Sequence, residues 1–201
     1  MDIIGASGHS KVILDTLRLN NKKVSGIWDD NIEIKDFAGY IMSGDIKSCL
    51  KSNPILPIIA IGNNKIRKKI DSFFVNVPFG TAIHPDAVIA KDVKVGEGTV
   101  VMANCSINTG SSLGRHVIIN TNASVDHDCI IGDFVHISPQ VGLAGQVEIG
   151  EGTHIGIGAC VIQCITIGKW CTIGAGAVII NNLPDGVTVV GNPGRIIKSK
   201  I

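Results

Sequence analysis

An aliphatic residue recurs at every sixth position over nearly half of this sequence. The uninterrupted series is Ile83, Ile89, Val95, Val101, Ile107, Leu113, Ile119, Val125, Ile131, Ile137, Leu143, Ile149, Ile155, Val161, Ile167, Ile173 and Ile179. A period of six matches neither the turn of an α-helix nor the two-residue alternation of an ordinary strand. It predicts short strands joined by turns, in which three hexads close a triangular coil of about 18 residues and successive coils pair about 4.8 Å apart.

The residues between these positions support the same fold. A small or β-branched residue stands two positions before each aliphatic residue, and glycine often follows it, as at Gly96, Gly114 and Gly132. Hydrophobic residues make up 45% of the chain but aromatic residues only 4%. The apolar content is therefore Val, Ile, Leu and Ala, which is typical of a strand-rich fold with a narrow interior.

The first 78 residues follow a different pattern, that of alternating strands and helices. We expect strands at 3–4, 23–28 and 57–61, and helices at 10–20 and 65–74, the second of them basic and amphipathic. Such units form a small parallel sheet, and ligands bind where the carboxyl ends of its strands meet. We therefore predict an α/β domain over residues 1–78, followed by the β-helix domain over residues 79–201.

Three predicted strands end in residues that suit a nucleotide. The first leads into G-A-S-G-H (residues 5–9), a glycine turn that opens a helix and can offer backbone N–H groups to phosphate. The second ends in Asp29 and Asp30, which can accept hydrogen bonds from a ribose or a base, and the third ends in Gly62. The glycine turn is not the dinucleotide-binding fingerprint, so a tight turn without a ligand remains an alternative.

The repeat resembles that of the hexapeptide-repeat acyltransferases, which fold as left-handed parallel β-helices. The segment G-N-P-G-R (residues 191–195) is similar to the closing segment of many of these enzymes, although Gly194 stands where alanine is usual. β-Helices of this kind also occur in carbonic anhydrase-like and nucleotide-binding proteins, so the repeat by itself indicates the fold more than the function.

The whole chain resembles the sugar O/N-acetyltransferase family. The stretches G-A-S-G-H, D-D, I-G-N-N-K-I-R-K-K-I and S-V-D-H-D-C carry this resemblance, and they are most similar to the branch that acetylates UDP-linked 4-amino-4,6-dideoxy sugars in bacillosamine biosynthesis. Two departures are Ser10, where glycine is usual, and Asp128, where that branch has glutamate. Sialic acid O-acetyltransferases belong to the same family, so O-acetylation of such a sugar is the alternative activity.

The resemblance implies an acetyl-CoA-dependent enzyme without a metal. Its acceptor would be the 4-amino group of a nucleotide-linked, UDP-type amino sugar, and direct transfer would occur in a ternary complex. A homotrimer is also implied, because the flat side of a single prism offers no deep groove for acetyl-CoA.

His127 is the candidate general base, because it follows the inward-facing Val125 by two positions and so projects outward at a turn. Histidine suits proton transfer near neutral pH, and an adjacent carboxylate can orient its ring and raise its basicity. Either Asp126 or Asp128 could do so, and the resemblance selects Asp128. A polar surface turn without a function is the alternative.

Further roles are implied only by the resemblance. The residues carried over to the acetyl-CoA site are His136, Gly145, Ile157 and Ala175, with the Gly145 N–H as the oxyanion donor. The residues carried over to the nucleotide-sugar site are Ser7, Gly8, His9, Asp29, Asp30, Gly62 and Asn120.

His84, His116 and His154 receive no role. His136 and His154 lie 18 residues apart and so stack on one face, which would suit a metal-dependent β-helix. A zinc site needs a third ligand that the pattern does not supply, so we expect no metal. We expect His84 and His116 to lie on the surface.

Charge and cysteine usage exclude several classes of function. The formal net charge of +1 gives no electrostatic footprint for nucleic acid or a membrane. We see no signal peptide and no apolar span of membrane length, and therefore expect a cytoplasmic protein. The six cysteines match no zinc-binding spacing and are expected to be structural.

Overall fold

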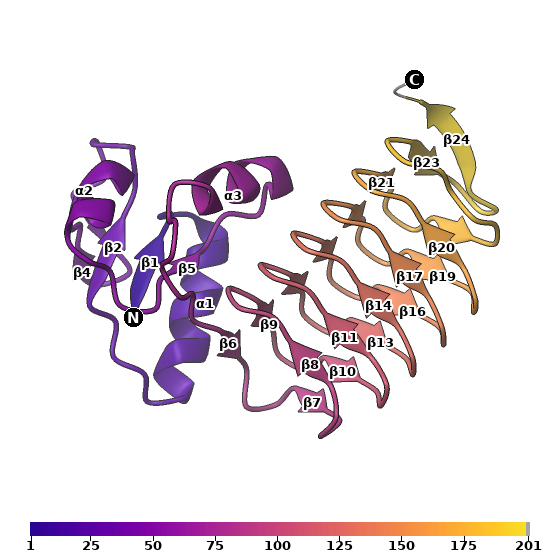
Figure 1. Cartoon of the computed structure of the whole chain (residues 1–201), viewed down its shortest axis with the longest axis horizontal. Coiled ribbons are helices and arrows are strands. Elements are labelled where there is room, and N and C mark those ends of the chain that lie inside the picture. Colours follow the sequence, from indigo (N-terminus) through magenta and orange to yellow (C-terminus); the bar gives the residue numbers. More distant parts are fainter. Residues whose placement is uncertain (200–201) are drawn as a thin grey trace.

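A computed structural model describes residues 1–199 and contains an N-terminal domain beside a long β-helix (Figure 1). The N-terminal domain has a parallel sheet of order β2-β1-β5, formed by β1 (Asp2–Ile4), β2 (Gly26–Trp28) and β5 (Ile58–Ile59). Its helices are α1 (Gly8–Leu19), α2 (Ile46–Lys51) and α3 (Asn64–Asp71). Helix α2 and a small hairpin of β3 (Asp36–Phe37) and β4 (Tyr40–Ile41) were not predicted.

The glycine turn after β1 is held by close packing. Gly5 has φ +110°, and a Cβ atom there would lie 2.9 Å from Ile61 Cγ1. The hydroxyl of Ser10 lies 2.7 Å from the carbonyl oxygen of Gly5 and 3.2 Å from that of Ala60. Ser10, where the family usually has glycine, thus ties the ends of β1 and β5 together.

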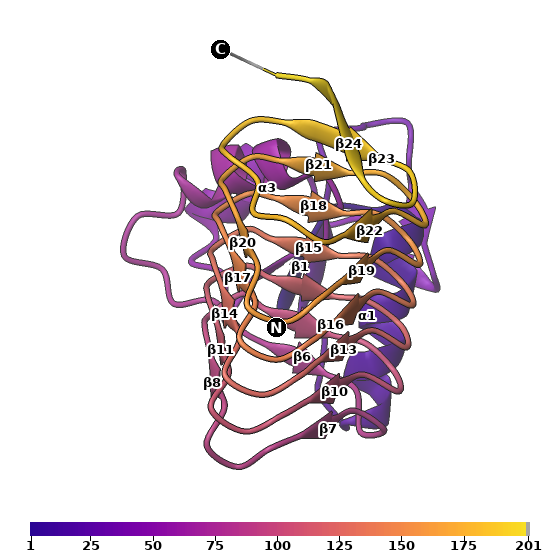
Figure 2. The ribbon, with the colours of Figure 1, turned by 90° about the vertical axis from the view of Figure 1, so that its right-hand side faces the viewer.

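The β-helix has three faces, each a parallel sheet of two-residue strands apart from its closing end (Figure 2). The eight-stranded face contains β6 (Ala82–Ile83), β9 (Val100–Val101), β12 (Ile118–Ile119), β15 (His136–Ile137), β18 (His154–Ile155), β21 (Thr172–Ile173), β23 (Thr188–Val190) and the antiparallel β24 (Arg195–Lys198). The six-stranded face contains β7 (Val88–Ile89), β10 (Ser106–Ile107), β13 (Ser124–Val125), β16 (Gly142–Leu143), β19 (Cys160–Val161) and β22 (Val178–Ile179). The five-stranded face contains β8 (Lys94–Val95), β11 (Ser112–Leu113), β14 (Ile130–Ile131), β17 (Glu148–Ile149) and β20 (Thr166–Ile167).

The six-residue repeat is confirmed as the inner column of the coils. From Val101 to Ile179 every aliphatic residue of the series is buried, with at most 3% of its surface exposed. Ile83, Ile89 and Val95 are only half-buried, because they belong to the first coil and have no coil beneath them.

A second six-residue pattern, not noticed in the sequence, marks the corners of the prism. Residues with positive φ recur there from Gly98 to Gly176, among them His116 at +53° and Asp128 at +58°. This left-handed conformation is tolerated best by glycine, asparagine and aspartate, and these residues fill most of the corner positions up to Asp128. The chain therefore turns sharply at each corner and places the side chain there outside the core.

The N-terminal domain docks on the eight-stranded face and on the corner between that face and the five-stranded one. Helix α1 packs against β6, and Asn20 Nδ2 donates a hydrogen bond to the carbonyl of Ile83. Helix α3 lies against the corner that carries His116, whose Nε2 lies 2.8 Å from an oxygen of Asp71. The expectation that His116 lies on the surface was wrong, because this docking and the rings of Phe79 and Phe134 bury it completely.

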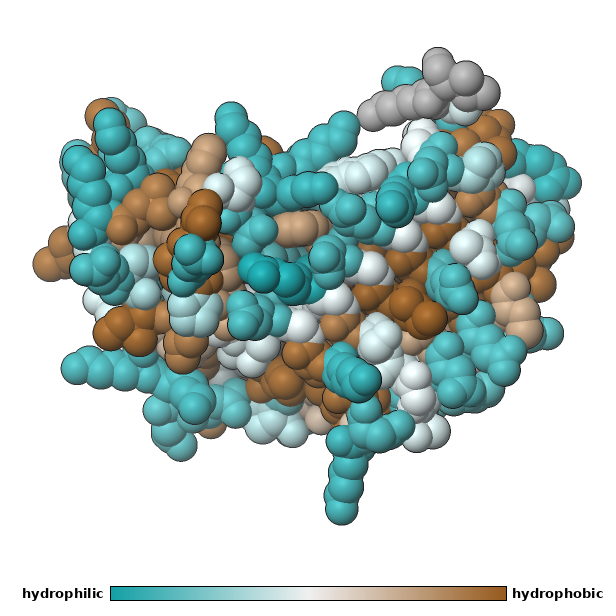
Figure 3. All heavy atoms as spheres, in the orientation of Figure 1, coloured by the Kyte–Doolittle hydropathy of each residue, from teal (hydrophilic) through white to brown (hydrophobic). Residues whose placement is uncertain are grey.

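The surfaces of the N-terminal domain and of the β-helix differ in hydropathy. Hydrophilic residues cover much of the N-terminal domain, whereas a band of apolar and neutral residues crosses the coils (Figure 3). Several large aliphatic side chains stay exposed on the β-helix, namely Ile130, Ile157, Ile162 and Ile180. Within residues 1–199, none of the helices has both the length and the apolar character needed to span a bilayer.

Candidate functional site

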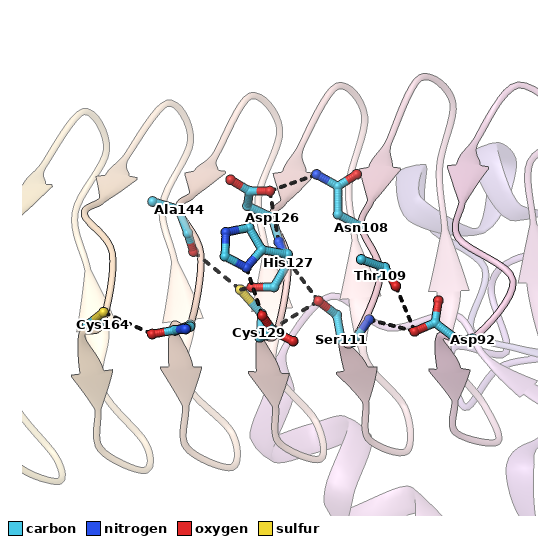
Figure 4. Close-up of polar contacts among 12 residues, drawn as sticks. Asp92, Asn108, Thr109, Ser111, Asp126, His127, Cys129, Ala144 and Cys164 are labelled. Atoms are coloured by element: carbon cyan, nitrogen blue, oxygen red, sulfur yellow. Dashed lines mark hydrogen bonds and ion pairs between the residues drawn. The ribbon is translucent and has the colours of Figure 1, made fainter.

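His127 lies at the corner between the six-stranded and five-stranded faces, in the turn from β13 to β14. Its Nδ1 is 2.8 Å from Asp128 Oδ2, so the aspartate side chain, although shorter than that of glutamate, reaches the ring. Asp126 Oδ1 accepts hydrogen bonds from the His127 N–H at 2.8 Å and from Asn108 Nδ2 at 2.7 Å, one coil below (Figure 4). The two aspartates therefore hold the ring and the backbone of the same histidine.

This arrangement makes His127 a better base than a free histidine. The hydrogen bond to Asp128 is the main cause that raises its pKa, and the negative charges of Asp126 and Asp128 act in the same direction. About half of the His127 side chain is exposed, so an incoming substrate can reach Nε2. The hydrogen bond from Asn108 lowers the pKa of Asp126 and keeps that carboxyl ionised.

Gly145 lies next to the ring of His127, one coil above. A Cβ atom at this position would stand 2.5 Å from His127 Nε2, so a larger residue would displace the ring. The N–H of Gly145 has no hydrogen-bond acceptor among residues 1–199. It is therefore a free backbone donor beside the candidate base, as an oxyanion donor must be.

The residues assigned to the nucleotide sugar gather at the carboxyl edge of the N-terminal sheet. Ser7 and Gly8 begin α1, Asp29 and Asp30 follow β2, and Gly62 follows β5. The carboxylates also serve the fold, because Asp29 Oδ2 accepts from Ala6 N at 2.7 Å and Asp30 Oδ1 accepts from Ile46 N at 3.0 Å.

This edge is open on the ligand side. A Cβ atom at Gly8 or at Gly62 would meet nothing within 4 Å. From Gly62, a pocket of about 390 Å³ extends between Asn63–Lys65 and the β-helix residues His154, Trp170 and Thr172. The sheet edge and the β-helix together therefore enclose a space large enough for part of a substrate.

His9, His136 and His154 form a cluster where this edge meets the eight-stranded face; His9 and His136 are partly buried and His154 is exposed. The rings of His136 and His154 stack with their centroids 4.8 Å apart, and His9 lies 6.5 Å from His136. Burial lowers the pKa of His9 to about 4 and that of His136 to about 3, and it also lowers the pKa of His154. All three are neutral at physiological pH, and the buried His9 Nε2 has no hydrogen-bond partner within residues 1–199.

The other residues assigned to acetyl-CoA lie near the edge of the same face. His136 Nδ1 is 3.4 Å from the carbonyl of Gly62, and its Nε2 is 3.3 Å from Asn120 Nδ2. Ile157 and Ala175 are exposed in the turns after β18 and β21, at the corner with the six-stranded face. The structure thus groups Asn120, assigned to the sugar, with His136 rather than with His127.

The candidate residues consequently form two groups that do not meet within one chain. The His127 corner joins the six-stranded and five-stranded faces, and it lies across the prism from the eight-stranded face that carries the histidine cluster. A ligand held at the sheet edge of one chain therefore has the base of that chain on the far side of the β-helix.

Two residues of α3 that the sequence did not single out hold the domains together. Arg67 is buried, and Asn64 Nδ2 donates to the carbonyls of Gly152 and Thr153 on the β-helix. Both belong to the stretch I-G-N-N-K-I-R-K-K-I, which was noticed only for its resemblance to the family. Among residues 1–199, no group of three or more His, Cys, Asp or Glu side chains is arranged to hold a metal ion.

Two protein-family descriptions match separate parts of the chain. Residues 2–72 match the PglD N-terminal domain, and residues 146–181 match the bacterial transferase hexapeptide of six repeats. The UDP-N-acetylbacillosamine N-acetyltransferase of Bacillus subtilis (strain 168) is 38% identical over 114 residues. That similarity covers half of this chain and half of the length of the relative.

Solved structures match almost the whole chain. The acetyltransferase domain of PglB from Neisseria gonorrhoeae FA1090, in complex with acetyl coenzyme A, is 39% identical with a TM-score of 0.92, covering 98% of both chains. PerB from Caulobacter crescentus, in complex with CoA and GDP-perosamine, is 38% identical with a TM-score of 0.91, covering 98% of this chain and 96% of the other.

Proposed function

We propose that this chain, which belongs to the hexapeptide-repeat sugar N-acetyltransferases with a PglD-type N-terminal domain, transfers acetyl from acetyl-CoA to a 4-amino group of a UDP-linked amino-dideoxy sugar. The observation that carries the proposal is the exposed His127, hydrogen-bonded through Nδ1 to Asp128 and free at Nε2. A histidine held in this way is ready to accept a proton from a sugar amine.

His127 Nε2 removes the proton as the amine attacks the thioester carbonyl. Asp128 accepts the hydrogen bond from Nδ1–H and stabilises the imidazolium that forms. The adjacent Gly145 N–H donates to the oxyanion, because it is not engaged elsewhere in the described chain. The amine therefore replaces the thiolate of coenzyme A directly, and no cysteine of this chain acts as a nucleophile.

The sheet edge of the N-terminal domain holds the nucleotide sugar. The open N-terminus of α1 at Ser7 and Gly8 favours a phosphate group, and Asp29 and Asp30 offer acceptors to the ribose or base. Support for UDP comes from the name of the Bacillus relative, whereas PerB was solved with a GDP-linked sugar. The neutral His136, with Ile157 and Ala175, lines the path of acetyl-CoA along the β-helix.

The active site is built between neighbouring subunits of a homotrimer. Within one chain the base and the sheet edge lie on different sides of the prism, so the base must come from the next chain. The six-stranded face lies next to the His127 corner and presents no charged residue; its outward residues are Val88, Ser106, Ser124, Gly142, Cys160 and Val178. Such a face can pack closely against another subunit without burying a charge.

A panel of acceptors tests this function. Thiol release from acetyl-CoA is followed with a UDP-linked 4-amino sugar, with dTDP- and GDP-linked 4-amino sugars and with free sialic acid. We expect turnover with the UDP-linked sugar and none with sialic acid. Preference for a GDP- or dTDP-linked sugar would correct the nucleotide, turnover with sialic acid alone would replace N-acetylation by O-acetylation, and inactivity with all four would contradict the proposal.

A further inference from the structure

Arg67 is the largest side chain that the fold buries completely. Only 1% of its surface is exposed, and all five N–H donors of its guanidinium are used. Nε donates to the carbonyl of His116 at 2.9 Å, and Nη2 donates to the carbonyl of Phe134 at 2.8 Å and to Asn64 Oδ1 at 3.1 Å. Nη1 donates to the carbonyls of Ile61 at 2.9 Å and Gly62 at 3.3 Å.

These acceptors belong to both domains. His116 and Phe134 occupy the same corner of two successive coils, 18 residues apart, whereas Ile61 and Gly62 form the loop after β5. Asn64 extends the contact to a third coil through its bonds to Gly152 and Thr153. One side chain and its neighbour thus fix the height of the Gly62 loop along the β-helix.

Packing alone does not require a guanidinium at this position. Among residues 1–199 no carboxylate forms an ion pair with Arg67, and burial lowers its pKa to about 9, which still leaves it charged at neutral pH. An apolar side chain of similar volume could fill the same space, but it would leave the carbonyls of Ile61, Gly62, His116 and Phe134 without this donor, which costs stability. The planar guanidinium of Arg67 fixes the geometry of five hydrogen bonds, and these hold the Gly62 loop in one position.

We infer that Arg67 is a positioning residue that sets the Gly62 loop against His136, and thereby places the nucleotide sugar relative to acetyl-CoA. The same Gly62 carbonyl that Arg67 binds lies 3.4 Å from His136 Nδ1. This inference rests on the proposed function. A displacement of about 1 Å at a reacting centre can cost about 100-fold in rate, so a loosened loop should lower turnover.

The test compares Arg67→Met and Arg67→Lys with the matched control Lys69→Met, an exposed cation on the same helix. For Arg67→Met we expect kcat/KM for the nucleotide sugar to fall about 100-fold with an unchanged KM for acetyl-CoA, and the melting temperature to fall because buried carbonyls lose their donor. Arg67→Lys should fall between, because an ammonium has three donors at one point instead of five in a plane. Lys69→Met should match the wild type.

Hydrogen–deuterium exchange gives a readout that does not depend on catalysis. Peptides covering residues 60–66 and 132–138 should exchange faster in Arg67→Met, while peptides of the upper coils should not change. If Arg67→Met does not fold, Asn64→Asp replaces it, since this variant keeps the acceptor for Arg67 but loses the amide donors to Gly152 and Thr153. It should show the same pattern at a smaller size.

Two results would overturn the inference. One is wild-type kinetics and exchange in a folded Arg67→Met, and the other is an equal loss of kcat/KM for both substrates in that variant. An inactive wild-type enzyme would instead contradict the proposed function, and the exchange data would still decide whether Arg67 holds the loop.

Discussion

The pKa of His127 and the pKa values of the cluster of His9, His136 and His154 are shifted in opposite directions by their surroundings. At the His127 corner the ring is half exposed, has a carboxylate on Nδ1 and has a raised pKa. Where the N-terminal domain meets the eight-stranded face, His9 and His136 are partly buried near the cation of Arg67, and their pKa values are lowered. The corner therefore favours the protonated ring, whereas the cluster favours the neutral one.

Under the proposed function, this difference would keep the catalytic base apart from the residues that bind the ligands. Each group obtains its pKa from its surroundings, aspartates in one case and desolvation in the other. A neutral histidine can accept or donate a hydrogen bond without competing for the proton that the base must take. Because the two groups lie on different sides of the prism, the proposed reaction would need the second group to come from another subunit.

The largest effect should come from removing the base. His127→Ala should lower kcat by about 100-fold to 10,000-fold, the usual contribution of general base catalysis. Its exposed ring contributes little to the core, so the melting temperature and the trimer should be retained. Steady-state kinetics with light scattering measures both, and wild-type turnover in an intact trimer would remove His127 from the mechanism.

A smaller effect is expected when Asp128, the hydrogen-bond partner of the His127 ring, is replaced. Asp128→Asn removes the main cause of the raised pKa, so the acidic limb of the pH profile of kcat/KM should move to lower pH. The maximum rate should fall about 10-fold, because a weaker base remains. Asp128→Glu, the residue of the related branch, is the matched control and should retain the wild-type profile. An acidic limb that stays in place in Asp128→Asn would show that His127 is not the titrating group.

The pH dependence of stability should distinguish the partly buried His9 and His136 from the exposed His127. His9 and His136 have pKa values of about 4 and about 3 in the folded chain against 6.5 in the unfolded one, so the unfolded chain binds more protons between these values. Stability should therefore fall as the pH falls from 6.5 towards 4, by up to about 3 kcal/mol for each histidine, because one pKa unit corresponds to about 1.4 kcal/mol.

The variant His136→Gln should flatten this dependence, whereas His127→Gln should not, because the raised pKa of His127 acts with the opposite sign. Urea unfolding at a series of pH values measures the difference. An unchanged slope in His136→Gln would show that this histidine is not held neutral by burial.

The sequence predicted the β-helix well because its signal is local and repeated. Each coil carries the same constraint, so one aliphatic residue in six is enough to place every strand from β6 to β22. The pairing of His127 with Asp128 was also within reach, since the two residues are adjacent at one corner.

The docking of the N-terminal domain on the β-helix could not be predicted from the sequence. The contacts of α3 with the corner residues join positions 44 to 89 residues apart, and no periodicity in the sequence indicates them. Arg67 belonged to a helix predicted as basic and amphipathic, in which a charged residue is normally exposed. The burial of His116 and the partial burial of His9 and His136 follow from the same docking.

Complementation between two inactive chains tests the central claim, that each active site combines His127 of one subunit with the sheet edge of its neighbour. One chain carries His127→Ala; the other carries Gly8→Leu and Gly62→Leu, positions where added side chains fill only the ligand space. In co-expressed trimers about three quarters are mixed, and each of these holds one intact site in three, so about one quarter of wild-type activity should return. Activity no higher than that of the two variants alone would show that the site lies within one chain.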